Sequence, residues 1–93
     1  MTRERQERIA AAGNTAVPAY LTLIALGYAV DRTDQDGREL WTATKGSLEL
    51  MADDTLALLG LCLLRSARGP RWPATDGEID AFMRRFYPAA GSA

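Results

Sequence analysis

Residues 56–64 form the longest apolar stretch of the chain, and the weakly polar thiol of Cys62 is their only polar side-chain group. A helix that is apolar on every side has to be covered on every side, by a protein core, a partner chain or lipid. We therefore predict a buried helix over residues 54–68, with Asp53 or Asp54 as its N-cap. One side is expected to cover a sheet, and the opposite side to meet another helix or a second subunit.

Apolar residues at helical spacing mark two further helices. Thr15 is suited to cap a helix over residues 16–26, in which Pro18 is tolerated in the first turn. The pattern Thr75-Asp76-Gly77-Glu78 is a capping box and predicts a last helix that Pro88 ends. In both helices the positions i, i+3, i+4 and i+7 are apolar and are expected to face the core. These positions are Val17, Tyr20, Leu21 and Ile24 in the first helix, and Ile79, Phe82, Met83 and Phe86 in the last.

Between these helices lies a region with the polarity and the turn residues of strands. Residues 28–32 and 38–44 predict two strands, joined by the turn cluster Asp34-Gln35-Asp36-Gly37. Lys45-Gly46 predicts a second tight turn, because glycine adopts the positive φ that a two-residue hairpin requires. Residues 47–51 follow as a third strand, so the region is expected to form an antiparallel meander.

The chain is therefore expected to be α+β, a three-stranded antiparallel meander covered by helices, in the order α-α-β-β-β-α-α. The first helix of this order is short and exposed, because residues 2–12 mix arginine and glutamate at helical spacings. We predict residues 1–13 as a charged N-terminal helix or arm, 14–88 as a single domain and 89–93 as a disordered tail. With only 93 residues, such a domain has a thin core.

The order helix, three strands, helix over residues 16–68 is similar to that of double-stranded RNA-binding domains. Those domains need lysines at the start of their last helix, where they meet phosphates across a groove. Asp53 and Asp54 occupy that position here, which argues against this activity.

The composition is that of a globular protein, with 47% hydrophobic and 25% charged residues. The 11 basic and 12 acidic side chains nearly cancel, so no net field attracts nucleic acid or an anionic membrane. No hydrophobic signal region follows the charged N-terminus, and the apolar run is shorter than the ~20 residues that span a bilayer. With Cys62 as the one cysteine, no disulfide forms within the chain. We therefore expect a cytoplasmic protein, neither secreted nor embedded in a membrane.

The residue types offer little for catalysis. The chain has no histidine, which excludes histidine-based general base catalysis, Ser-His-Asp triads and histidine metal sites. A single buried thiol argues against zinc and dithiol redox sites, and glycine-rich phosphate loops do not occur. Four carboxylates surround the first hairpin, but their spacing departs from that of an EF-hand loop, so we interpret them as a solvated turn. They are Asp31, Asp34, Asp36 and Glu39. We expect no enzyme, no cofactor and no metal site.

An arginine cluster beside Trp72 is the first candidate site for a partner. The turn at residues 69–70 is expected to fold the last helix back and so to bring five arginines together. Such a cluster holds phosphate or carboxylate, and a tryptophan adds base stacking or an interface anchor. The alternative interpretation is helix-dipole complementation and surface ion pairs with Asp76, Glu78 and Asp80. The arginines are Arg65, Arg68, Arg71, Arg84 and Arg85.

Gly60 and Leu61, within the apolar helix, form the second candidate site. Glycine in a helix costs about 1 kcal/mol relative to alanine and often permits the close approach of another element. Together with Ala57, Gly60 is expected to form a flat patch for a crossing helix. A charge at the neighbouring Leu61 is therefore expected to alter folding or association.

These patterns favour a small non-catalytic protein-interaction module that binds another protein, or a second copy of itself as a homodimer. Bacterial immunity and antitoxin-type proteins are similar in size and composition and act by occlusion alone. The alternative is a nucleic-acid-binding accessory protein that uses the arginine cluster, and it predicts salt-sensitive binding. An enzyme or small-molecule carrier that uses carboxylates or a pocket is a third class.

Overall fold

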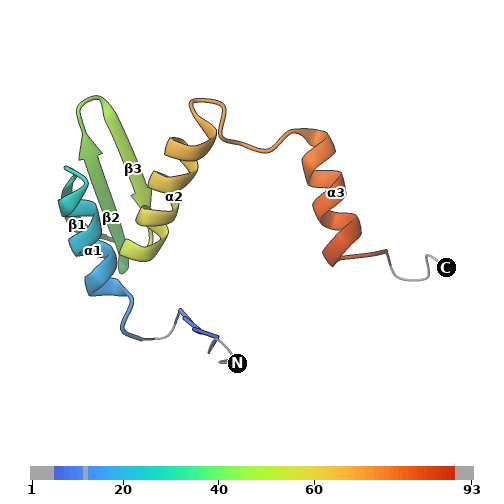
Figure 1. The fold of residues 1–93 in the computed structure, drawn as a ribbon. Coiled ribbons are helices and arrows are strands. Elements are labelled where there is room, and N and C mark those ends of the chain that lie inside the picture. Colours follow the sequence, from blue (N-terminus) through green and yellow to red (C-terminus); the bar gives the residue numbers. More distant parts are fainter. Residues whose placement is uncertain (1–5, 12, 90–93) are drawn as a thin grey trace, which may run out of the picture. The chain divides into compact units, whose positions relative to one another are not determined.

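The computed structural model describes residues 6–11 and 13–89 and divides the chain after Leu63 into two compact units. The first unit holds a helix, a sheet and most of a second helix, and the second unit holds the end of that helix, a connection and a third helix. Figure 1 shows these elements along the chain. The domain boundaries expected from the sequence stay a prediction, and each unit is described by itself.

Three antiparallel strands form the sheet of the first unit, in the order β1 (Ala29–Gln35), β2 (Arg38–Lys45) and β3 (Leu48–Ala52). Asp36 and Gly37 join β1 to β2 with φ values of 53° and 78°, which is the pair of positive angles that a type I′ turn requires. This two-residue turn lets β1 continue to Gln35, three residues beyond the predicted strand. The α+β class and the antiparallel meander are confirmed.

The register of the strands places the apolar residues on one face of the sheet. Val30 pairs with Ala43, and Ala43 pairs with Leu50, so these three side chains form a row across the sheet. Ala43 and Leu50 are buried and belong to the core cluster. The opposite face carries Thr42 and the exposed Met51, and neither α1 nor α2 covers it.

Two helices cover the apolar face of the sheet (Figure 1). They are α1 (Ala16–Ala25) and α2 (Thr55–Arg68). Asp54 caps α2, because its carboxylate accepts a hydrogen bond of 2.7 Å from the amide of Ala57. Leu23 of α1 and Leu58 of α2 are fully buried against the sheet, and they form the centre of the core.

The predicted core face of α1 is wrong. The structure buries Ala19 and Leu23, whereas the four residues expected in the core are exposed. Those residues are Val17, Tyr20, Leu21 and Ile24. The physical reason is that α1 carries no charged side chain. Without a polar side to mark the solvent, more than one apolar stripe satisfies the helical spacing, and the sheet selects the stripe with the small Ala19.

The described residues cover only part of α2, and the expected cover of its opposite side by another helix or a second subunit stays a prediction. Thr55, Leu58 and Cys62 face the core and are buried. On another side of the helix Leu56 is exposed, and Leu63 keeps 65% of its surface accessible. The predicted contact with the sheet is present on one side of α2, but within the described residues another apolar side lacks cover.

The second unit holds the last turn of α2, a connection over residues 69–75 and α3 (Asp76–Phe86). The predicted capping box is confirmed, since the Thr75 hydroxyl accepts from the Glu78 amide at 3.2 Å and the Glu78 carboxylate accepts from the Thr75 amide at 2.9 Å. The predicted burial of Ile79, Phe82, Met83 and Phe86 is wrong, because no residue of α3 is buried. This unit offers no sheet on which an apolar stripe can pack.

The N-terminal helix expected over residues 2–12 is absent from residues 6–11, and residues 1–5 and 12 lie outside the described part of the chain. Ile9, the one large apolar side chain of this segment, is almost fully exposed. An isolated helix shorter than about 12 residues is marginal in water without packing. Of the predicted disordered tail, only Ala89 is described, outside any helix or strand.

Candidate protein-binding surface

The structure gives Arg68 a bridging role at the start of the second unit. Its Nε donates a hydrogen bond of 2.7 Å to the Trp72 carbonyl, and its Nη2 lies 2.8 Å from Oε1 of Glu78. Arg68 thereby links the end of α2, the connection and the first turn of α3. The Thr75 amide and Arg68, in that order, hold the pKa of Glu78 below its ordinary value.

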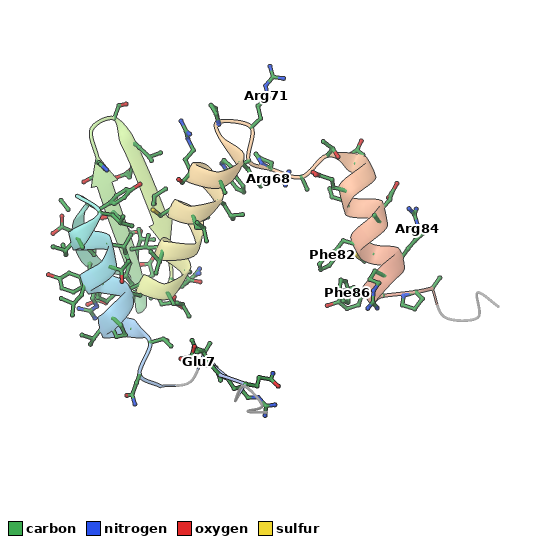
Figure 2. The ribbon with its side chains drawn as sticks, viewed as in Figure 1. Glu7, Arg68, Arg71, Phe82, Arg84 and Phe86 are labelled. Atoms are coloured by element: carbon green, nitrogen blue, oxygen red, sulfur yellow. The ribbon has the colours of Figure 1, made fainter. Side chains whose placement is uncertain are left out.

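The structure does not bring the five arginines together. Figure 2 shows Arg71 extending from the connection, whereas Arg84 lies on α3 apart from both Arg68 and Arg71. Arg85 stacks on the Phe86 ring with its guanidinium carbon 5.0 Å from the ring centroid. The remaining members of the predicted site are Arg65, which is half-buried in the last turn of α2, and Trp72, which is partly exposed. Their role in partner binding stays a prediction.

Gly60 and Leu61 lie within the part of α2 that belongs to the first unit. Gly60 is exposed, and a Cβ added to it meets nothing within 4 Å. Leu61 is half-buried and packs against the core. In the described structure no crossing helix contacts Gly60, so the flat patch is open, and its role in binding stays a prediction.

Two of the four carboxylates of the first hairpin, those of Asp34 and Glu39, form ion pairs with Arg32. Arg32 lies 2.9 Å from Glu39 and 3.0 Å from Asp34, and the indole of Trp41 donates to Glu39 at 3.1 Å. These bonds, the one from Arg32 first, lower the pKa of Glu39, and the bond to Glu39 raises the pKa of Arg32. Among the described residues, no three acidic or thiol groups are placed to hold a metal ion.

A surface that sequence reasoning missed covers the outer side of the helix layer. The chain carries no charged residue between Arg8 and Asp31, and none between Asp54 and Arg65. Leu21 on α1 and Leu63 on α2 are both more than half exposed. The signal is present in the sequence, because residues 9–30 carry no charge and a helix without any charge on its solvent side needs a partner.

A groove runs between the two helices of this layer. It has a volume of about 190 Å³, and its lining contains no charged side chain. The lining residues are Thr15, Pro18, Ala19 and Thr22 from the α1 side, and Leu56 and Leu59 from α2. We call these residues together with the exposed Leu21 and Leu63 the α1–α2 surface. A second hollow of about 260 Å³ lies beside α1 and reaches Trp41.

Two hydrogen bonds fix the helices that carry this surface. The buried Thr55 hydroxyl donates to the Ala16 carbonyl at 2.7 Å and joins the first turns of α2 and α1. At the other end of α1, the Lys45 ammonium donates to the Leu26 carbonyl at 2.8 Å. The groove is therefore built by anchored helices, which reduces the entropy that a ligand would lose by ordering it.

The α1–α2 surface has the chemistry of a binding site for an apolar partner. It carries no ionisable group that could transfer a proton, and the one thiol nearby, that of Cys62, is buried. Monomeric proteins rarely expose apolar patches larger than a few hundred Å², and larger ones mark interaction sites. Thr15 and Thr22 are the polar residues of the groove lining, and the Thr22 hydroxyl donates a hydrogen bond of 2.7 Å to the Pro18 carbonyl.

Comparison with known proteins finds no family model, no curated protein and no solved structure that matches this chain. Over residues 6–11 and 13–89, no helix has both the length and the apolar character needed to cross a membrane.

Proposed function

We propose that this chain is a non-catalytic protein-interaction module that binds another protein through the α1–α2 surface. The observation that carries the proposal is the exposure of apolar side chains on α1, which has no charged residue, and on residues 55–64 of α2, which also have none. An amphipathic helix of a partner fits such a groove, because its apolar face replaces water along both walls. Each large side chain buried in this way contributes about 1.5–3 kcal/mol.

The biological setting belongs to the same proposal. A bacterial immunity or antitoxin-type protein acts in the cytoplasm by covering the active part of its partner. Occlusion of this kind requires shape and apolar area and no reacting group, which agrees with the absence of histidine from the chain. The lone buried thiol is compatible with a reducing compartment.

The test compares two lysine substitutions in tagged full-length protein purified from its native cells after nuclease treatment. Leu63→Lys places a charge on the α1–α2 surface, and Met51→Lys places one at another apolar position that is more than half exposed, on the uncovered face of the sheet. We expect the wild type and Met51→Lys to retain one stoichiometric protein, and Leu63→Lys to lose it while its circular dichroism stays unchanged. Equal recovery of that protein with Leu63→Lys would contradict the proposal.

A second candidate function, nucleic-acid binding, is favoured by the exposed pair Arg71 and Trp72 in the connection before α3. Arg71 makes no ion pair with the described residues, so its charge is available to a phosphate. Binding of a fluorescent single-stranded oligonucleotide should then weaken with salt and with Arg71→Ala. Oligonucleotide binding that changes neither with salt nor with Arg71→Ala would exclude nucleic-acid binding by this pair.

A further inference from the structure

The hollow of about 260 Å³ beside α1 shares no lining residue with the groove that faces α2. We call it the Trp41 hollow, and its surface is almost entirely apolar. Of its polar side-chain groups, the Thr55 hydroxyl already donates to the Ala16 carbonyl, and the Trp41 indole donates to Glu39. The hollow therefore offers a bound group apolar contact and few hydrogen bonds. Its lining consists of Ala16, Val17 and Tyr20 from α1, Trp41 from β2 and Thr55 from α2.

The size of the Trp41 hollow suits a single side chain. Pockets for small molecules have volumes of about 300–1,000 Å³, and this hollow is smaller. An aliphatic side chain fits an apolar site of this kind, because it brings no polar group that would lose its hydrogen bonds to water. We therefore expect the occupant to be an exposed aliphatic side chain that can reach the hollow.

Ile9 is the side chain that meets these conditions. It keeps 84% of its surface accessible, more than any other large apolar residue that the structure describes. It belongs to residues 6–11, which form neither a helix nor a strand, so this segment can move without unfolding an element. Residues 9–15 carry no charge, and therefore no charged side chain of this stretch has to leave water when Ile9 packs beside α1.

The chain holds Ile9 within short range of the hollow. Ile9 lies seven residues before Ala16, which lines the hollow, and seven extended residues span about 23 Å. Residues 13 and 14 form a turn directly before α1, and a Cβ added to Gly13 meets nothing within 4 Å. A short flexible tether gives a local concentration of about millimolar. Below that concentration, Ile9 of the same chain outcompetes a side chain of equal affinity on a free partner or on a second copy.

We propose that residues 6–11 form a strap that closes over the Trp41 hollow and places Ile9 between Tyr20 and Trp41. The structure shows the strap open, with Ile9 in solvent. On closure, the side chain and the hollow cover each other and both leave water. Packing one side chain requires no helix in the strap, which agrees with the irregular backbone of residues 6–11. The inference does not depend on the proposed function, because the Trp41 hollow is distinct from the α1–α2 surface.

The fluorescence of Trp41 reports whether the strap is closed. In full-length Trp72→Phe protein Trp41 is the only tryptophan, and the carbonyl of residue 72 that binds Arg68 is kept. We expect Ile9→Ser to raise the acrylamide quenching constant of Trp41 about twofold, because the indole loses its cover. Ala11→Ser, a matched change two residues further along the strap, should leave the constant unchanged. Equal quenching constants for Ile9→Ser and Ala11→Ser would overturn the proposal.

Charges at two positions of α1 test whether Ile9 binds in the hollow. Val17 lines the Trp41 hollow and Leu21 does not, and both are more than half exposed, so an aspartate at either position should leave the fold intact. We expect Val17→Asp to raise the quenching constant as much as Ile9→Ser does, and the double variant to raise it no further, because both changes release the same contact. Leu21→Asp should leave the constant unchanged. Additive effects of Val17→Asp and Ile9→Ser would contradict the proposed position of Ile9.

Nuclear Overhauser effects distinguish a strap that closes on its own chain from one that crosses to a second copy. In dilute full-length protein, we expect contacts between the Ile9 methyl groups and the Trp41 ring. An isotope-filtered experiment on mixed labelled and unlabelled chains should show none of these contacts between chains. Contacts found only between labelled and unlabelled chains would assign the hollow to a second copy, and the absence of any contact between Ile9 and Trp41 would show that the strap stays open. Either result would overturn the proposal.

Discussion

Thr55 shows how much one buried polar residue decides in a small unit. Its side chain is only 3% exposed, yet its hydroxyl donates a hydrogen bond to the Ala16 carbonyl at 2.7 Å. The bond crosses from α2 to α1, two helices that otherwise leave a groove between them. A valine has the same shape without the donor, so the bond can be removed without creating a cavity.

We expect Thr55→Val to lower the free energy of unfolding by about 1 kcal/mol, because a net hydrogen bond contributes 0.5–1.5 kcal/mol. Thr22→Val removes an exposed hydroxyl that bonds to Pro18 within α1 and should change stability by less than about 0.5 kcal/mol. Urea denaturation monitored by tryptophan fluorescence measures both. Equal losses of unfolding free energy in the two variants would show that the hydrogen bond between α1 and α2 stabilises the protein no more than the exposed bond within α1 does.

The ionisation of Glu78 is expected to make the stability of α3 depend on pH. Its pKa is lowered from the ordinary value of 4.5 by the Thr75 amide first and Arg68 second. Because the folded pKa lies below the unfolded one, the stabilisation is present above pH 4.5 and is lost as the pH falls through the lowered value. Below that pH, the cap and the bridge to Arg68 weaken together.

In the wild type, we expect the Thr75 amide proton shift to titrate with a midpoint below 4.5, and α3 helicity to fall over the same range. Glu78→Gln keeps a side-chain oxygen for the cap but removes the charge. Its Thr75 amide shift should therefore stay flat over that range in a nuclear magnetic resonance titration. An unchanged titration in the variant would assign the transition to another carboxylate.

At the scale of elements, the buried side of α1 differs from the side that the spacing of its apolar residues predicts. Its apolar positions at i, i+3, i+4 and i+7 describe a valid stripe, but the sheet contacts another one, through Ala19 and Leu23. The row of Val30, Ala43 and Leu50 lies beneath the helix layer. The buried stripe of α1 is therefore set by its neighbours and not by its own sequence.

Two alanine substitutions distinguish these two stripes. Leu23→Ala should lower the free energy of unfolding by about 2–5 kcal/mol, because Leu23 is fully buried and its removal leaves a cavity. Leu21→Ala should cost less than about 1 kcal/mol, since Leu21 is more than half exposed. Denaturant unfolding of the two variants gives the comparison. A larger loss of unfolding free energy for Leu21→Ala than for Leu23→Ala would show that α1 buries the stripe predicted from spacing.

Local sequence signals predict the helices and strands well. They do not predict which residues contact each other when these are distant in sequence. The Asp36-Gly37 turn and the capping box of Thr75 and Glu78 depend on neighbouring residues, and both are present. The core face of α1 depends on the sheet, and the cover of α3 depends on residues that its own unit does not supply. Residues 2–12 had helical charge spacing but no surface to pack against.

For the candidate site as well, the sequence predicts local features and does not predict contacts between distant residues. The sequence predicts a contact at Gly60 because a glycine inside an apolar helix permits the close approach of another element. Gly60 and Leu61 lie in the helix that carries half of the α1–α2 surface. The groove itself requires α1 beside α2, which no local pattern predicts. Of the two interpretations of Arg68, the surface ion pair is present, because Arg68 bonds to Glu78 and to the Trp72 carbonyl of its own chain, and its role toward a partner stays a prediction.

At the scale of the whole molecule, burial is unevenly distributed between the two units. The core cluster of buried residues lies entirely in the first unit, and α3 contributes none. A capping box and a bridge contribute only a few kcal/mol at most to a helix of this length. The two units are therefore expected to differ strongly in local stability.

Hydrogen exchange of the full-length protein at low concentration measures this difference. Amides of β2, which pair on both sides, should exchange most slowly, and amides of α3 should exchange within a small factor of the unfolded rate. Uniform protection of both regions would show that the units unfold together.

The buried thiol of Cys62 has a practical consequence. It is the only sulfhydryl of the chain, and it lies at the contact between α2 and the sheet. An aromatic disulfide reagent can reach it only when that contact opens, so the labelling rate reports the opening equilibrium of the helix–sheet core without any engineered probe. A ligand bound in the groove should slow the labelling of Cys62, and the slowing should increase with the fraction of protein that is bound. The labelling rate of this one sulfur would therefore detect an unknown partner.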